Sequence, residues 1–221
     1  MKDREYWAIR RFTSYDNPYL DPNEIEQAKK QLDSITFAQE YLAEDVDAND
    51  RPFLYAFTNA HIQEYRPNQH LQLIISFDFN KDPMTCLIGQ SANIKHLAVF
   101  DELKIQNGST PELCDMIKAK YPQYIGRILV TGDASGRNRS PLVKGGLNHY
   151  LIIKRELLVK DSQFMVRKQN LSHINSRMLC NSVLQNATFV ITPNCKETQI
   201  DMLYGSVDEN GTLLKTSERG L

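Results

Sequence analysis

Two aspartates close apolar segments of the chain. Asp78 interrupts the run that begins LIISF, at a position that the pattern places inside a strand, where aspartate is uncommon. Asp133 ends the apolar stretch RILVTG and is followed by Ala-Ser-Gly. Burying an unpaired carboxylate is costly, and a bound cation would offset that cost. We therefore consider Asp78 and Asp133 as candidate metal ligands, while each also fits an ordinary turn-forming aspartate.

A pair of carboxylates suits Mg²⁺ or Mn²⁺, because these hard cations prefer oxygen ligands. In a two-metal site the ions lie about 3.5–4 Å apart, and they activate water and stabilise the leaving oxygen. The pair therefore predicts metal-dependent hydrolysis of phosphodiester bonds, with Asp78 and Asp133 as both the catalytic residues and the metal ligands.

The elements around these aspartates predict how they meet. Strand patterns cover residues 71–80, 84–93 and 96–105, and the short loops between them indicate an antiparallel meander. Residues 110–122 predict a helix with Thr110 as its N-cap, and residues 127–133 predict another strand. A strand reached through a helix should run parallel to an earlier one. This places the first and fourth strands side by side, with Asp78 facing Asp133.

The rest of the chain predicts an α/β domain behind a helical arm. Residues 1–66 are polar, and they predict two short helices after Asp21-Pro22, with a break near Asp33-Ser34. The second half predicts a helix over 144–159 opened by two glycines, a strand over 162–168, a helix over 171–186, a strand over 188–194 and a helix over 195–207. We expect an arm or linker at 1–66 and an α/β domain at 67–221.

Overall composition does not by itself indicate a nucleic-acid binder. The 221 residues carry a formal net charge of -1, but a local basic surface is enough for phosphate contacts. Basic residues follow Asp133 and recur further on, and either DNA contact or a solvated loop explains them. The candidates for DNA binding are Arg137, Arg139, Lys144, Arg167 and Lys168.

Other residues give weaker signals. Asp82 precedes a proline and fits a turn, and Asp101 and Glu102 fit edge or solvent-facing positions of a strand. The five histidines are scattered, and the four cysteines form no CxxC pair, which predicts reduced, mostly buried thiols rather than zinc. We find no secretory signal and no apolar run of the roughly 18 residues that a membrane span needs.

Together these motifs resemble a known family. FDFNKDP, followed by VTGDASGRNRS, resembles the nuclease domain of phage terminase large subunits. NPYLDPNEIEQAKKQLDSITFAQEYLAE resembles the stretch that joins the ATPase domain of that family to its nuclease. NLSHINSRMLCNSVLQNATFVITPNCKETQIDML resembles the late helix, strand and helix of the nuclease. The likeness covers nearly the whole chain in the same order.

The resemblance implies a ribonuclease H-like fold: a mixed sheet with a three-strand meander and parallel strands, flanked by helices. It also implies cleavage of concatemeric viral double-stranded DNA during packaging, with Mg²⁺ or Mn²⁺ held by Asp78 and Asp133. The implied partners are the terminase ATPase domain, the small terminase subunit and the portal, in the cytoplasm of a bacterial host. The chain has no GxxxxGK[ST] motif, so we expect the nuclease part, with 1–66 as the end of the ATPase region.

One departure concerns the third acidic ligand of the family, which lies near a histidine in a final helix. No segment after Lys215 fits, so we expect the domain at 67–221 to lack its last helix. Asp201 and Asp208 are substitutes, although a helix face and a turn also explain them. Two alternatives stay open: another ribonuclease H-like nuclease (a junction resolvase, transposase-type enzyme or RNA–DNA hybrid nuclease), and a non-catalytic packaging or assembly module.

Overall fold

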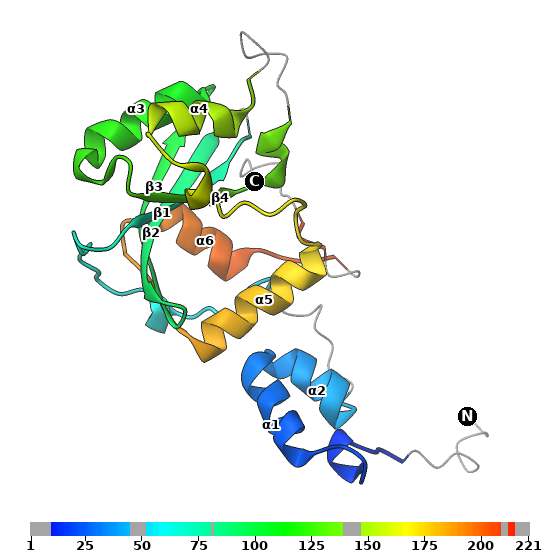
Figure 1. Cartoon of the computed structure of the whole chain (residues 1–221). Coiled ribbons are helices and arrows are strands. Elements are labelled where there is room, and N and C mark those ends of the chain that lie inside the picture. The colour runs from blue at the N-terminus through cyan, green and yellow to red at the C-terminus, as the bar shows by residue number, and fades with distance from the viewer. Residues whose placement is uncertain (1–9, 45–51, 81, 139–146, 209–211, 215–221) are drawn as a thin grey trace.

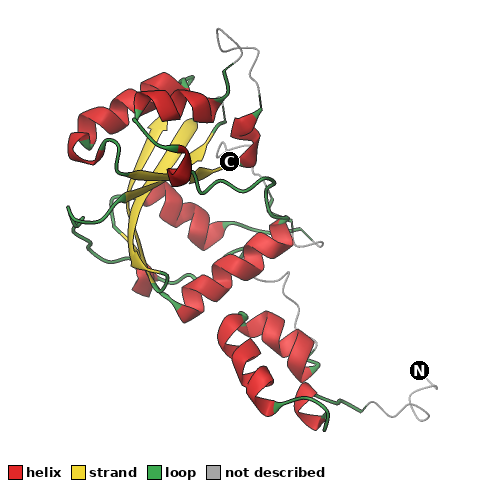
Figure 2. Cartoon of the chain, in the orientation of Figure 1, coloured by secondary structure: helices red, strands yellow, loops and turns green. Residues whose placement is uncertain are grey.

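The structure is a computed structural model that describes residues 10–44, 52–80, 82–138, 147–208 and 212–214. A mixed sheet lies at its centre, with five strands in the order β4-β1-β2-β3-β5 among these residues (Figure 2). The strands are β1 (Leu73–Asp78), β2 (Met84–Asn93), β3 (His96–Ile105), β4 (Ile128–Gly132) and β5 (Thr188–Ile191). β1 to β3 form the predicted meander, and β4 and β5 run parallel to β1 and β3 at the two edges.

Helices lie on both sides of the sheet (Figure 1). α3 (Thr110–Lys120) and α4 (His149–Glu156) pack together on one side, and α5 (His173–Asn186) and α6 (Lys196–Tyr204) lie on the other. In the described ranges we find no helix whose length and hydropathy would suit it to crossing a membrane.

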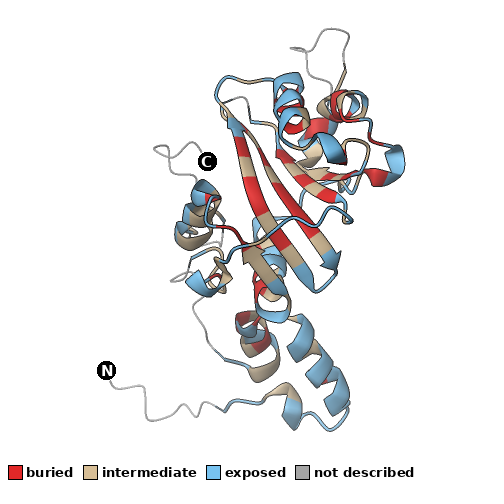
Figure 3. Ribbon diagram, turned by 90° about the vertical axis from the view of Figure 1, so that its left-hand side faces the viewer, coloured by how far each residue is buried: buried red, intermediate tan, exposed pale blue. Residues whose placement is uncertain are grey.

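The main core lies between the sheet and α3 and α4. Side chains of a strand alternate between its two faces, and Leu73, Ile75 and Phe77 of β1 are all buried. They meet buried residues of the neighbouring strand and helices, which include Ile128, Val130, Leu113, Ile117 and Ile153. Figure 3 shows buried positions as bands along the strands of the sheet. The side chains of Ile74, Ser76 and Asp78 consequently leave β1 on the opposite face.

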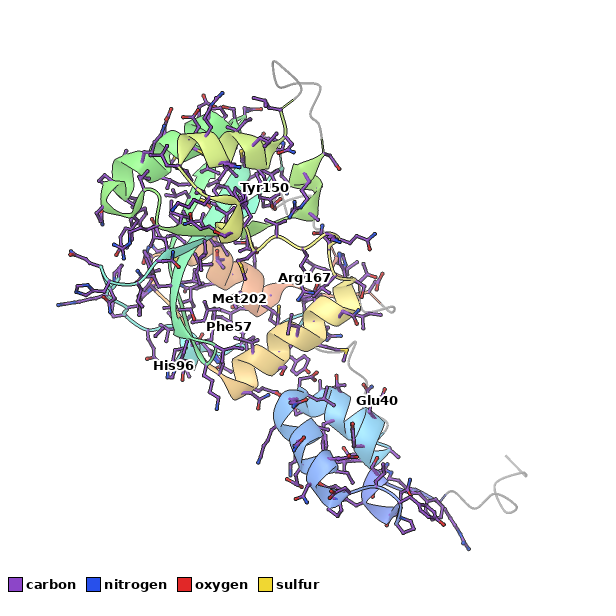
Figure 4. The ribbon with its side chains drawn as sticks, in the orientation of Figure 1. Glu40, Phe57, His96, Tyr150, Arg167 and Met202 are labelled. Atoms are coloured by element: carbon purple, nitrogen blue, oxygen red, sulfur yellow. The ribbon has the colours of Figure 1, made fainter. Side chains whose placement is uncertain are left out.

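A smaller cluster fills the space on the α5 and α6 side. Phe57, Leu184, Ile191 and Cys195 are buried there, and Met202 packs against them. Figure 4 shows Phe57 and Met202 between α5, α6 and the sheet. All four cysteines are free thiols, with Cys180 exposed and Cys86, Cys114 and Cys195 buried, in keeping with the sequence-based interpretation.

The arm contains the two predicted helices, α1 (Pro22–Gln31) and α2 (Ser34–Leu42). Asp33 lies at the predicted break and caps α2, because its carboxylate accepts hydrogen bonds from the main-chain amides of Ile35 and Thr36. The arm contacts α5 through polar side chains, including those of Ser182 and Gln185. The proposed boundary between residues 66 and 67 stays a prediction.

Three sequence-based predictions were wrong in detail. Ser109, not Thr110, is the N-cap of α3, and it forms a capping box with Glu112. Asn148 caps α4, so this helix begins after the two glycines of the predicted opening, which lie outside the described residues. Residues 162–168 form no named strand: a short 3-10 turn spans Asp161–Gln163, and only a single bridge joins Phe164 to Val130.

Candidate functional site

Asp78 and Asp133 lie at the ends of two adjacent parallel strands. Asp78 is the last residue of β1, and Asp133 directly follows β4. Phe77 and Gly132 are partners in the register, and the amide of Asp133 donates a 3.1 Å hydrogen bond to the carbonyl oxygen of Phe77. Asp78 and Asp133 directly follow this last pair of the ladder, so they lie next to each other at the carboxyl ends of β1 and β4. The predicted adjacency of β1 and β4 is confirmed, but Asp78 is an exposed strand end rather than a mid-strand residue. The role of the two aspartates stays a prediction.

Gly132 permits this close approach of the two strands. Its φ is +138°, which disfavours residues with a side chain. A Cβ atom added there would lie 2.2 Å from the carbonyl oxygen and 2.8 Å from the nitrogen of Phe77. The glycine before Asp133 therefore has a structural role of its own.

Polar groups surround the two carboxylates. Oδ1 of Asp133 accepts hydrogen bonds from the amide of Ser135 at 2.8 Å and from Nδ2 of Asn170 at 2.6 Å, and Oδ2 accepts one from Oγ of Ser135 at 2.8 Å. Asn80 donates to Oδ2 of Asp78 at 2.9 Å. Each aspartate thus makes the local contacts of a turn residue, and the two aspartates also lie next to each other.

An aromatic cluster supports both strand ends. The ring of Phe79, next to Asp78, stacks on His149 at a centroid distance of 4.5 Å and meets Tyr150 edge-on at 5.1 Å. The hydroxyl of Tyr150 donates a 2.7 Å hydrogen bond to the carbonyl oxygen of Asp133. Figure 4 shows Tyr150 on α4, at the opposite end of the sheet from His96. The cluster fixes the loop after β4 against the residues after β1.

Burial shifts the titration of this cluster. It raises the pKa of Tyr150 well above its usual value, and the nearby Asp133 carboxylate adds to the rise. Tyr150 therefore stays protonated at neutral pH and remains a donor. Burial lowers the pKa of His149, whose Nδ1 lies 2.6 Å from Oγ1 of Thr110.

No protein-family model matches the sequence, and no curated protein matches it either. Solved structures do match the fold. The large terminase of a thermophilic bacteriophage aligns over 94% of this chain and 50% of its own, with 16% identity and a TM-score of 0.67. The P22 large terminase nuclease domain aligns over 76% of this chain and 86% of its own, with 14% identity and a TM-score of 0.51.

This chain has the ribonuclease H-like fold of a phage large terminase nuclease domain. It spans about half the length of the thermophilic-phage terminase that it matches. At these identities the likeness establishes the fold, so the chemistry must be argued from the residues.

Arg137 is the described basic residue nearest to the two aspartates along the chain. Its Nη2 donates a 2.9 Å hydrogen bond to the carbonyl oxygen of Val166, and its guanidinium lies 5.9 Å from the Tyr150 ring. Arg167 and Lys168 are exposed on the segment before α5, where Figure 4 labels Arg167. The other two candidates for DNA binding, Arg139 and Lys144, lie outside the described residues.

Asp82, Asp101 and Glu102 make structural contacts. Asp82 accepts a hydrogen bond from the amide of Asn107, as a turn residue would. Asp101 was expected at an edge or solvent-facing position, and the solvent-facing alternative was wrong: it is 4% exposed, and it is paired with Lys120 at 2.7 Å and with the Tyr121 hydroxyl at 2.6 Å. Glu102 accepts hydrogen bonds from the first turn of α6. These contacts come from distant elements, which the sequence pattern does not reveal.

The donor set at the two strand ends consists of oxygen atoms, the type that Mg²⁺ and Mn²⁺ prefer. Within the described residues no group of three or more His, Cys, Asp or Glu side chains is placed to hold a metal. Of the two suggested substitutes, Asp201 lies on α6, and Asp208 accepts a hydrogen bond from the amide of Thr212, as expected for a turn. Asp78 and Asp133 therefore form the candidate site as a pair.

Proposed function

We propose that this chain is a metal-dependent endonuclease that cleaves double-stranded viral DNA during genome packaging. The observation that carries the proposal is the placement of Asp78 and Asp133 next to each other, at the carboxyl ends of adjacent parallel strands. Two carboxylates in such positions repel each other unless positive charge is near. The terminase nuclease fold supports duplex DNA as the substrate.

We further propose that Asp78 and Asp133 are protein ligands of two Mg²⁺ or Mn²⁺ ions. Such ions, when bound, supply activation of water and stabilisation of the charge that develops on the phosphate. The residues of the chain hold the ligands in place: Ser135 and Asn170 orient the Asp133 carboxylate, and Tyr150 holds its main chain. The exposed side chains of Arg137, Arg167 and Lys168 supply positive charge for DNA phosphates.

The proposed partners follow from the same likeness. They are double-stranded DNA, a terminase ATPase domain, the small terminase subunit and the portal, in the cytoplasm of an infected bacterium. Residues 1–66 would be the end of the ATPase region, and the polar contacts between α5 and the arm would transmit its position to the nuclease.

The decisive experiment is nicking of supercoiled plasmid by the full chain with Mn²⁺ or Mg²⁺, with and without a chelator. We expect metal-dependent cutting that Asp78→Asn and Asp133→Asn each reduce by about 100-fold or more. Asp115→Asn is the matched control, because this exposed carboxylate on α3 forms an ion pair with Lys118 away from the site. Calorimetric titration with Mn²⁺ should show binding that the first two changes weaken and the control does not.

Two results would contradict the proposal. No cutting, together with Mn²⁺ binding that is absent or unaffected by the two changes, would favour a packaging or assembly role. Strong preference for a four-way junction or an RNA–DNA hybrid over linear duplex would instead favour another ribonuclease H-like nuclease.

A further inference from the structure

The side-chain amide of Asn170 makes two hydrogen bonds with consecutive residues of the candidate site. Its Nδ2 donates to Oδ1 of Asp133 at 2.6 Å, and its Oδ1 accepts from the amide of Ala134 at 2.9 Å. The second bond fixes which end of the amide faces the carboxylate, because a flipped side chain would set its oxygen against Oδ1 of Asp133. Asn170 therefore acts on Asp133 only as a donor.

The chain brings Asn170 to this place by a route that is itself anchored. The amide of Met165 donates to the carbonyl oxygen of Val130 on β4 at 2.7 Å, and the carbonyl of Val166 accepts from Arg137 at 2.9 Å. Beyond Asn170, the side chain of Ser172 caps α5. Residues 165–172 thus run from the edge strand of the sheet to a helix start, with Asn170 between two fixed points.

Asn170 differs from Ser135, which also donates to Asp133. Ser135 lies two residues away and makes the local turn contacts that an aspartate at a helix start makes on its own. Asn170 is 37 residues away, so folding has to place it. Asn170 is also neutral, so it orients the carboxylate and leaves the negative charge that a bound cation requires. A lysine or arginine in its place would cancel that charge.

We propose that Asn170 is a positioning residue that orients the Asp133 carboxylate toward a divalent cation. This inference rests on the proposed function, in which Asp133 is a metal ligand. Hydrogen bonds to a ligating carboxylate fix its direction, and their loss typically costs 10–100-fold in metal affinity or activity. Because Ser135 still holds Asp133 when the amide is removed, the expected loss is at the lower end, about tenfold.

The test is calorimetric titration of the full chain with Mn²⁺, with nicking measured in parallel over a range of Mn²⁺ concentrations. Asn170→Ala should weaken Mn²⁺ binding by about tenfold and raise the Mn²⁺ concentration for half-maximal nicking by a similar factor. Asn170→Leu, which keeps nearly the same size but has no polar side-chain atoms, should repeat the result. Asn194→Ala is the control, since this exposed side-chain amide likewise donates one hydrogen bond, to the main-chain carbonyl of Phe100 at the β3 side of the sheet.

The outcomes separate this inference from the function on which it rests. One outcome would overturn the role of Asn170 alone: the wild-type protein binds Mn²⁺ and Asp133→Asn abolishes that binding, but Asn170→Ala and Asn170→Leu keep full affinity. A lower melting temperature with unchanged Mn²⁺ affinity would do the same, because it would assign Asn170 to stability. Wild-type protein with no Mn²⁺ binding would overturn both the function and the inference.

Discussion

The main-chain amide of Asp133 donates a hydrogen bond of 3.1 Å to the carbonyl oxygen of Phe77, the residue before Asp78. This bond extends the parallel ladder of β1 and β4 by one step beyond Gly132. It keeps the two aspartates on neighbouring strands at their carboxyl ends, where ligand sites of α/β sheets gather. Changes that separate the strands here should therefore affect the site before they affect the rest of the fold.

Gly132→Ala is expected to separate them. The added methyl would lie 2.2 Å from the Phe77 carbonyl oxygen, on a backbone with φ of +138°. We expect a loss of about 2–4 kcal/mol in the free energy of unfolding, from crowding and backbone strain together. Urea denaturation measures this loss, and Mn²⁺ affinity should fall as well.

Gly126→Ala is the control for this change. Gly126 also has a positive φ, of +79°, but the nearest atom to an added Cβ is 3.8 Å away. Gly126→Ala should therefore lower the free energy of unfolding by only about 1–2 kcal/mol, from backbone strain, and leave the metal affinity unchanged. Equal losses in both properties would show that crowding against Phe77 is unimportant.

The hydroxyl of Tyr150 should matter to the site and not only to stability. Tyr150→Phe removes the bond to the Asp133 carbonyl, and Tyr124→Phe removes a bond of the same kind to the Asn68 carbonyl. Each should lose about 1 kcal/mol of folding free energy, measured by urea denaturation. Only Tyr150→Phe should slow plasmid nicking, and an equal slowing by Tyr124→Phe would count against the special position of Tyr150.

His149 should make the stability depend on pH. Because burial lowers its pKa, the folded protein binds this proton less readily than the unfolded chain, whose histidines titrate near 6.5. The contribution of neutral His149 to the free energy of unfolding is therefore fully present above pH 6.5, and it is lost as the pH falls toward the pKa of His149 in the folded protein. His149→Gln should flatten the dependence of the unfolding free energy on pH below about 6.5. The assignment to His149 fails if the variant keeps the slope of the unchanged protein over this range.

Asn181 should control how segment 52–57 is held on α5. Its buried side chain donates to the Phe53 carbonyl and accepts from the Ala56 amide, both at 2.9 Å. Asn181→Ala leaves these two groups without that partner, at an expected cost of about 2–4 kcal/mol. Hydrogen exchange of the Ala56 amide should become faster.

Asn186→Ala provides the contrast on the same helix, since its side chain is exposed. A change within about 0.5 kcal/mol is expected there. Similar losses at Asn181 and Asn186 would mean that the contact with segment 52–57 does not set the cost, because alanine by itself favours the helix over asparagine.

The sequence predicted the meander well because its signals are local. The bounds of β2 and β3 match the apolar and β-branched patterns, and the break between α1 and α2 falls at the capping residue Asp33. Alternation in strands and capping in helices depend on residues within a few positions of one another. The same local pattern failed at residues 162–168, where the chain makes only one bridge to β4 before it leaves toward α5.

By itself the sequence determined the order of the elements, and the rule for crossover connections then placed Asp78 beside Asp133. Only the tertiary structure decided what surrounds them: the approach at Gly132, the aromatic support from Phe79 and Tyr150, and the amide of Asn170. It also decided that Asp101 is buried and forms an ion pair with the exposed Lys120. Strand order follows from short-range pattern and chain connectivity, whereas the partners of one side chain depend on how all the elements pack at once.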